Sequence, residues 1–260
     1  TRDLAAGIFV AAEDHPLVTL RLGAGWEWVA EYYPIENRTG RSPVTITLPA
    51  PAADPSFVAF RGAIAAAAKA RIYADLEALV QPQGFFWDRD FGNGYDPKKP
   101  SVDNLAAAVA LERGDGMGWD KLAGFAVEKS LEPLDSRPGV FCAPARPGYN
   151  AVEFSKLLDT TYTNAAEWAY PLADGVPVRG APRANAPATG KLALNFVRHL
   201  GQQRADSDAA APPWARVALP DGKIGYVEPG HLSALAVERL CYVKDMVAGW
   251  RITGFVGGGS

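Results

Sequence analysis

Residues 214–227 read Trp-Ala-Arg-Val-Ala-Leu-Pro-Asp-Gly-Lys-Ile-Gly-Tyr-Val, and the fold prediction starts from this stretch. Two runs of alternating apolar residues, 214–219 and 223–227, flank the turn sequence Pro220-Asp221-Gly222. Asp-Gly favours a tight hairpin turn because glycine adopts a positive φ without steric cost. The pattern therefore predicts a β-hairpin, and short strands with turn signals at this spacing are typical of a small barrel.

The same pattern continues upstream, at Val176–Pro182 and Gly190–Leu194. With the hairpin, these runs resemble a bacterial SH3-like domain, although the polar, alanine-rich segment 197–213 is longer than many loops of that family. The positions that carry the resemblance are Val176, Val178, Arg179, Pro182, Ala188, Leu192, Trp214, Val217, Asp221, Gly222, Lys223, Gly225, Tyr226, Val227 and Leu232. The resemblance implies a small SH3-like β-barrel over residues 172–236. Such domains are accessory modules of envelope proteins that bind peptidoglycan or peptides and are not themselves catalysts.

A wider likeness covers the chain from about Phe57 to Gly258. It rests on the loop Phe-Trp-Asp-x-Asp-Phe-Gly-x-Gly-x-Asp at 86–96, on Cys-Ala-Pro at 142–144 and on Trp-x-Ile-x-x-Phe-Val-x-Gly at 250–258. These features are similar to a group of uncharacterised bacterial SH3-domain-containing proteins. The likeness implies an envelope setting and no established chemistry, and it does not reach residues 1–55.

The remaining pattern predicts helices and one more hairpin. Apolar residues spaced three and four apart favour a helix over 57–80, and helices are also expected over 102–112 and 120–129. Alternating runs around Gly249 predict a hairpin over 237–256. We therefore expect an α+β fold with a helical N-terminal unit, a small SH3-like β-barrel and a terminal β-hairpin. The expected domains are a β-rich segment 1–55, a helical domain 56–170, the barrel 172–236 and a hairpin 237–260 that packs on the helical domain.

Composition excludes some classes of partner. The 260 residues carry a net charge of −3, which argues against a general nucleic-acid binder because such a protein needs a basic surface. No apolar run approaches the ~20 residues that cross a bilayer. The chain begins at Thr1 rather than Met, so we expect that a signal peptide has been removed and that the protein is periplasmic or secreted. The expected partner is peptidoglycan or an envelope protein or peptide.

The two cysteines, Cys142 and Cys241, are compatible with one disulfide. The alternative is two buried free thiols in a cytosolic protein. The envelope association of SH3-like modules favours the bridge, since disulfides persist in oxidising compartments. In the chain-entropy model, a bridge between Cys142 and Cys241 contributes about 4–5 kcal/mol to stability, because it closes a long loop of the unfolded chain.

Three carboxylates, Asp88, Asp90 and Asp96, form the candidate metal site. Calcium takes oxygen ligands from a flexible, glycine-bearing loop, which this stretch supplies, but Gly92, Asn93 and Lys99 do not match an EF-hand. Calcium is therefore the one cofactor considered. Turn and cap hydrogen bonds are the competing explanation for these residues. Paired carboxylates also serve glycoside hydrolysis when about 5–10 Å apart, and sequence does not give that separation.

The candidate ligand-binding residues are Arg179, Trp214 and Tyr226, in the groove of the expected barrel, with plain barrel core as the alternative. Cys142 with His15, His199 or His231 suggests a cysteine peptidase, but its Phe-Cys-Ala-Pro context differs from the Asp-Cys-Ser context of cell-wall peptidases. These cysteines and histidines show no zinc-ligand spacing. We expect a non-catalytic envelope binding module. The alternatives are a cell-wall hydrolase or calcium-dependent enzyme that uses the Asp88–Asp96 loop, and a structural domain without a small ligand.

Overall fold

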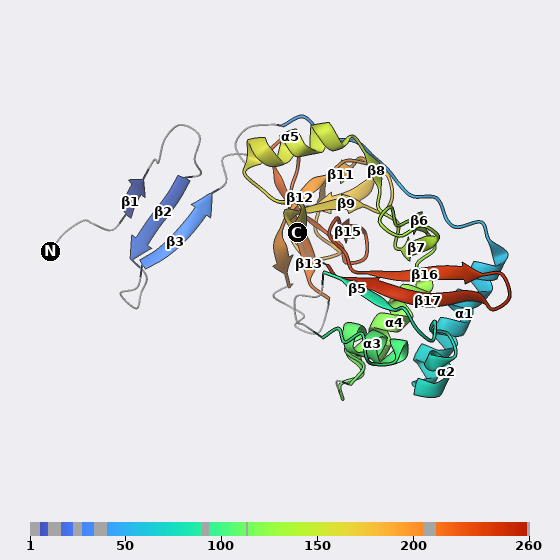
Figure 1. Ribbon diagram of the computed structural model, residues 1–260. Coiled ribbons are helices and arrows are strands. Elements are labelled where there is room, and N and C mark those ends of the chain that lie inside the picture. Colours follow the sequence, from blue (N-terminus) through green and yellow to red (C-terminus); the bar gives the residue numbers. More distant parts are fainter. Residues whose placement is uncertain are drawn as a thin grey trace. The chain divides into compact units, whose positions relative to one another are not determined.

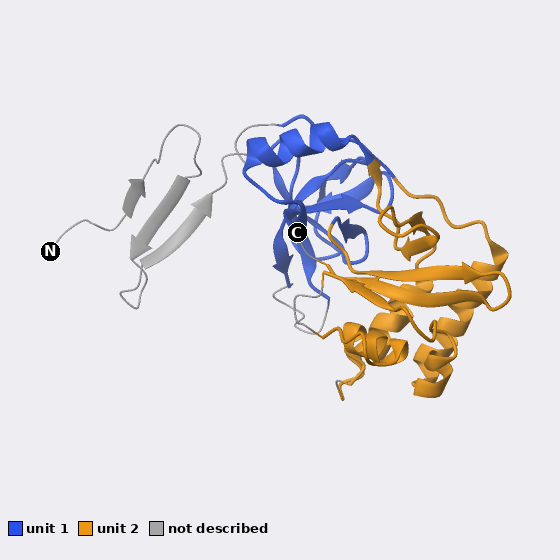
Figure 2. Cartoon of the chain, in the orientation of Figure 1, with its two compact units in different colours: residues 1–47, 149–235 blue, residues 48–148, 236–260 orange. Residues whose placement is uncertain are grey.

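The computed structural model describes residues 41–89, 94–112, 114–204 and 212–258, together with the backbone of three N-terminal strands. The chain divides into two compact units, which Figure 2 distinguishes by colour. Unit 1 contains residues 1–47 and 149–235, and unit 2 contains residues 48–148 and 236–260. Each unit is therefore built from two separate stretches of sequence.

The three N-terminal strands form an antiparallel sheet of their own (Figure 1). They are β1 (Ala6–Phe9), β2 (Leu17–Leu22) and β3 (Trp28–Tyr33). The β2–β3 register pairs Leu17 with Tyr33 and Leu22 with Trp28. These strands lie within residues 1–55, which the sequence analysis expects to be β-rich.

Unit 1 is organised around a seven-stranded sheet of order β11-β10-β14-β13-β12-β9-β15. Its strands are β9 (Trp168–Pro171), β10 (Val176–Arg179), β11 (Ala188–Leu192), β12 (Val197–Gln203), β13 (Trp214–Ala218), β14 (Ile224–Val227) and β15 (Leu232–Ala234). The predicted hairpin is β13–β14, in which Ala218 pairs with Ile224. Gly222 has a φ of 83° in its turn, as the Asp-Gly signal requires.

The predicted fold class is wrong. The described residues form mostly sheet, in ladders of two, three, five and seven strands with only a few helices, and they contain no closed barrel. β11 and β15 stand at the two ends of the seven-stranded order, and no ladder within the described ranges joins them. The physical reason is that alternation and turn residues specify which neighbouring strands pair, whereas closure depends on strand tilt and stagger, which short-range patterns do not report.

One helix, α5 (Ala151–Thr161), and a short 3₁₀ turn, η2 (Ala165–Glu167), precede the large sheet of unit 1. Asn150 caps α5, its Oδ1 accepting the amides of Val152 and Glu153 at 3.0 and 3.2 Å. Phe154 on the helix packs against Phe196, with ring centroids 4.5 Å apart. Two-residue strands, β4 (Ile46–Thr47) and β8 (Gly148–Tyr149), occupy the stretches where the chain passes from one unit to the other.

Unit 2 combines a five-stranded sheet with four helices. The sheet order is β5-β17-β16-β7-β6, and β5 alone runs parallel to its neighbour. Its strands are β5 (Phe86–Asp88), β6 (Glu132–Pro133), β7 (Val140–Ala143), β16 (Arg239–Asp245) and β17 (Gly249–Val256). The helices are α1 (Pro55–Ala70), α2 (Tyr73–Glu77), α3 (Ser101–Val109) and α4 (Met117–Val127). The predicted helix 57–80 is interrupted at Arg71, whose φ of 56° ends α1.

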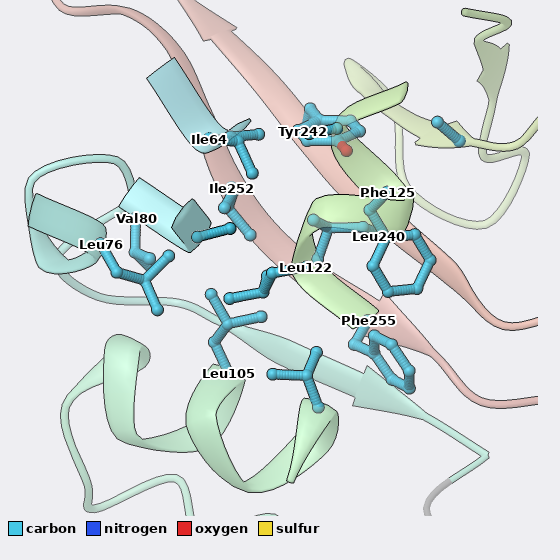
Figure 3. Close-up of a cluster of buried hydrophobic side chains, with 14 of the residues drawn as sticks. Ile64, Leu76, Val80, Leu105, Leu122, Phe125, Leu240, Tyr242, Ile252 and Phe255 are labelled. Carbon is cyan, nitrogen blue, oxygen red and sulfur yellow. The ribbon is translucent and has the colours of Figure 1, made fainter. Parts of the chain in front are cut away.

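The core of unit 2 lies where the helices meet the hairpin β16–β17 (Figure 3). The side chains that Figure 3 labels there are Ile64, Leu76, Val80, Leu105, Leu122, Phe125, Leu240, Tyr242, Ile252 and Phe255. Ile64, Leu76 and Leu122 are fully buried, as are Leu240 and Ile252. The terminal hairpin therefore supplies the centre of this sheet and much of this core.

The disulfide between Cys142 and Cys241 is confirmed. The two residues are direct partners in the β7–β16 register, and both are fully buried. Within the described ranges, no helix is both long and apolar enough to span a bilayer.

Candidate functional site

The three predicted ligand-binding residues lie on one face of the sheet of unit 1. Arg179 on β10 is the direct cross-strand partner of Tyr226 on β14, and Tyr226 is the partner of Arg216 on β13. Trp214 stands two residues before Arg216, so the pleat directs both side chains to the same side. We name Arg179, Trp214, Arg216 and Tyr226 the Trp-Arg face.

The opposite face of the same strands holds the apolar core of unit 1. Val178, Val217 and Val227 are fully buried there and alternate with the residues of the Trp-Arg face. Trp214 does not belong to this valine cluster, although it is 6% exposed. The sequence left open whether Trp214 is plain core, and the register places it on the face that carries the two arginines.

Gly225 brings β10 and β14 close enough to pair Arg179 with Tyr226. A Cβ at residue 225 would lie 2.2 Å from Cγ1 of Val178, far inside van der Waals contact. Any other residue would push the two strands apart. The glycine that the hairpin pattern showed between Ile224 and Tyr226 therefore has a packing role.

Hydrogen bonds fix two side chains of the Trp-Arg face. The Tyr226 hydroxyl donates to Oε1 of Gln203 at 2.9 Å, and Nη1 of Arg179 donates to the carbonyl of Ala186 at 2.8 Å. Arg216 is exposed and forms no ion pair within the described part of the chain. The face thus offers the part-exposed ring of Tyr226 and guanidinium donors that retain hydrogen-bonding capacity, while the Trp214 ring is buried. Sequence reasoning missed Arg216, although its spacing from Trp214 was the signal for it.

The loop of the predicted metal site holds its described carboxylates in other bonds. Asp88 forms an ion pair with Arg137 at 3.1 Å, and Oδ1 of Asp96 accepts the amide of Lys98 at 2.9 Å. Asp90 lies outside the described residues. Among the residues that the structure describes, no three His, Cys, Asp or Glu side chains gather as a metal site would require. For Asp88 and Asp96, turn and ion-pair bonding is what the geometry provides.

The cysteine-peptidase hypothesis has no nucleophile at Cys142. Its sulfur is bonded to that of Cys241, so no thiolate forms there. Burial lowers the pKa of His199, so its imidazole is neutral at pH 7. His15 lies outside the described residues.

Unit 1 also contains a cavity of about 440 Å³ that the sequence did not predict. Its wall includes Arg41, Glu153 and Lys156. The Arg41 guanidinium donates to the carbonyl of Ala218 at 2.8 Å and lies 5.0 Å from the Trp168 ring centroid. Burial lowers the pKa of Arg41 to about 10, against the opposing attraction of Asp221. Because positively and negatively charged side chains both line this cavity, it favours neither an anion nor a cation.

Comparison with protein-family models, with curated proteins and with solved structures returned no match. The resemblance to bacterial SH3-domain-containing proteins therefore stays a prediction from the sequence.

Proposed function

We propose that this chain is a non-catalytic binding module of the cell envelope that recognises a peptide or peptidoglycan-type ligand through the Trp-Arg face. The observation that carries the proposal is the gathering of Arg179, Trp214, Arg216 and Tyr226 on one side of adjacent strands. The rest of the proposal rests on the chemistry of these four side chains.

Tyrosine, tryptophan and arginine are the residue types that dominate binding energy at interfaces. Aromatic rings give large, rigid contact areas for sugar rings or proline, and a guanidinium pairs with a carboxylate through two parallel hydrogen bonds. Peptidoglycan carries both sugars and peptide carboxylates. A surface with exposed Arg216 and part-exposed Arg179 and Tyr226 matches that combination.

The disulfide supports an oxidising compartment for this function. Cys142 and Cys241 are bonded, and such bonds are rare in the cytosol. A periplasmic or secreted location fits both this bond and an envelope ligand.

The test is a pull-down of the purified full chain with intact peptidoglycan sacculi, followed by analysis of released fragments. We expect retention without release of fragments. Arg216→Gln and Tyr226→Ala should each lower the retained fraction, by about fivefold for a contact of roughly 1 kcal/mol. Arg183→Gln is the matched control because Arg183 is exposed in the same unit and has no ion pair within the described residues.

Other outcomes would contradict the proposed function in different ways. Release of fragments that Asp88→Ala abolishes would identify the alternative, a cell-wall hydrolase that uses the Asp88–Asp96 loop. Retention that is equal in Arg216→Gln, Tyr226→Ala and the control would remove the Trp-Arg face from the proposal. No retention of the wild-type chain would contradict recognition of peptidoglycan and direct the search to protein partners.

A further inference from the structure

A cavity of about 660 Å³ lies within unit 2, between the chain that follows Val80 and the first turn of α3. Its wall includes Phe85, Tyr95, Lys98, Lys99, Ser101 and Asn104. The volume is in the range that accommodates a small organic molecule, about 300–1,000 Å³. We name it the α3 cavity.

The first turn of α3 has unused amides, and one of them belongs to Ser101 in the cavity wall. Pro100 is the N-cap residue and has no side-chain oxygen that could accept a hydrogen bond. The amides of Asp103 and Asn104 donate to the carbonyl of Pro100, at 3.1 and 3.2 Å. Those of Ser101 and Val102 have no acceptor within the described part of the chain. Free amides and the helix dipole together attract a negative charge.

The side chain of Ser101 is a second, independent feature of this cavity. Ser101 is only 4% exposed, and its hydroxyl forms no hydrogen bond with any residue that the structure describes. Because Ser101 belongs to the cavity wall, a ligand in the cavity is the available partner.

Positive charge completes the site. Lys98 and Lys99 line the cavity and form no ion pair with the described carboxylates, and the described residues of its wall include no Asp or Glu. Asn104 holds the lysine loop against α3, since its Oδ1 accepts the amide of Asp96 at 2.9 Å and its Nδ2 donates to the carbonyl of Asp96 at 2.8 Å. The nearest helical carboxylate, Asp103, accepts a hydrogen bond from the Tyr73 hydroxyl instead.

The remaining wall combines apolar side chains with Gln83. Phe85 is 3% exposed, and the Tyr95 hydroxyl donates to the Phe85 carbonyl at 2.8 Å. Pro82, Pro97 and Pro100 complete this side. Tyr95 and the prolines of the wall therefore offer apolar contacts beside the groups that suit an anion.

We propose that the α3 cavity binds a small organic oxyanion, a phosphate or carboxylate group carried by an apolar body. The oxyanion accepts hydrogen bonds from the amides of Ser101 and Val102 and from the Ser101 hydroxyl, and Lys98 and Lys99 neutralise its charge. The apolar body packs on Phe85 and Tyr95. This site lies in unit 2 and is independent of the Trp-Arg face in unit 1.

The test titrates phenyl phosphate into the full chain and follows binding by calorimetry. We expect saturable binding that weakens as salt is added, because the contact is electrostatic. The double variant Lys98→Gln/Lys99→Gln should weaken binding by at least about tenfold, and Ser101→Ala by about threefold. Lys69→Gln is the matched control, since it removes the same charge from an exposed lysine of unit 2 outside the cavity wall.

Three further probes separate the possible sources of the anion. Inorganic phosphate lacks the apolar body, benzoate replaces phosphate with carboxylate, and benzyl alcohol lacks the charge. Stronger binding of benzoate than of phenyl phosphate would identify a carboxylate ligand, and the reverse order a phosphate ligand. Benzyl alcohol binding as tightly as either anion would overturn the proposal. No binding of either anion, or binding that the double variant leaves unchanged, would also overturn it.

Discussion

Cys142 and Cys241 face each other directly across β7 and β16, and their disulfide joins the middle of the chain to its last hairpin within unit 2. Both residues are fully buried. The bond stabilises the fold mainly because it restricts the conformations of the unfolded chain. It restricts a loop of 99 positions, which contains the strands β9 to β15 of unit 1.

Removal of the bridge by Cys142→Ala/Cys241→Ala should lower the free energy of unfolding by about 4–5 kcal/mol. Urea denaturation with and without reductant measures this difference. Reductant should shift the midpoint of the wild-type chain toward that of the double variant and leave the variant unchanged. Equal midpoints for oxidised wild type and variant would show that the bond does not stabilise the fold.

Gly225→Ala should destabilise unit 1 by about 1–3 kcal/mol, because the added Cβ would overlap Cγ1 of Val178 at 2.2 Å. Thermal or urea denaturation measures the loss. Val178→Ala in the same chain removes the overlapping methyl groups, so the double variant should lose less than the two single variants together. Gly190→Ala is the control in the same sheet, since a Cβ there meets nothing within 4 Å. Additive losses would contradict the predicted clash.

Glu132→Gln should destabilise unit 2 by about 2–4 kcal/mol, because it leaves a buried guanidinium without its counter-charge. Glu132 pairs with Arg239, whose side chain is 5% exposed. Burial lowers the pKa of Arg239, and Glu132 opposes that effect. Arg146 also pairs with Glu132, at 2.7 Å, but its side chain is 48% exposed. Arg146→Gln should therefore change stability by about 1 kcal/mol or less, and equal losses in the two variants would contradict the importance of burial.

Glu128→Gln should stabilise the protein at neutral pH. Burial raises the pKa of Glu128, and the attraction of Arg61 only partly opposes this. Glu128 is also the C-cap residue of α4, and a negative charge is unfavourable at a helix C-terminus. The folded state thus binds the proton more tightly than the unfolded state, and stability falls as pH rises above the ordinary value of about 4.3.

Denaturation of wild type and Glu128→Gln at several pH values tests this sign. The variant should be more stable at pH 7, and the difference should vanish below about pH 4, where the carboxyl is protonated in both states. Arg61 and Tyr242 are the groups whose charges couple to Glu128. A difference that persists unchanged in acid would assign the effect to packing rather than to the charge.

Local signals in this sequence reported local structure. Asp221-Gly222 indicated the β13–β14 turn, and the alternation in residues 214–219 agrees with Val217 in the core and Arg216 on the other face. What such signals omit is the pairing of distant strands. The order β13-β12-β9-β15 and the open ends of the sheet depend on tilt and stagger, so the predicted barrel was wrong.

The helices of unit 2 were also predicted only in part. The apolar spacing of Phe57, Phe60 and Ile64 matches the buried face of α1. The end of α1 at Arg71 was missed because no glycine or proline marks it. The α3 cavity was missed for a related reason. The sequence predicted a helix over 102–112, whereas Pro100 is the N-cap of α3 and Ser101 is its first residue.

The central position of β16 and β17 has a consequence for the order in which the chain acquires structure. These strands follow every described strand of unit 1 in the sequence. During synthesis the ribosome therefore delivers all the strands of unit 1 before the middle of the other sheet exists. Until Leu240 and Ile252 emerge, the apolar faces of α1 and α4 have no sheet to cover them. An incomplete chain therefore leaves apolar surface of unit 2 exposed, and intermediates of this kind are prone to aggregate.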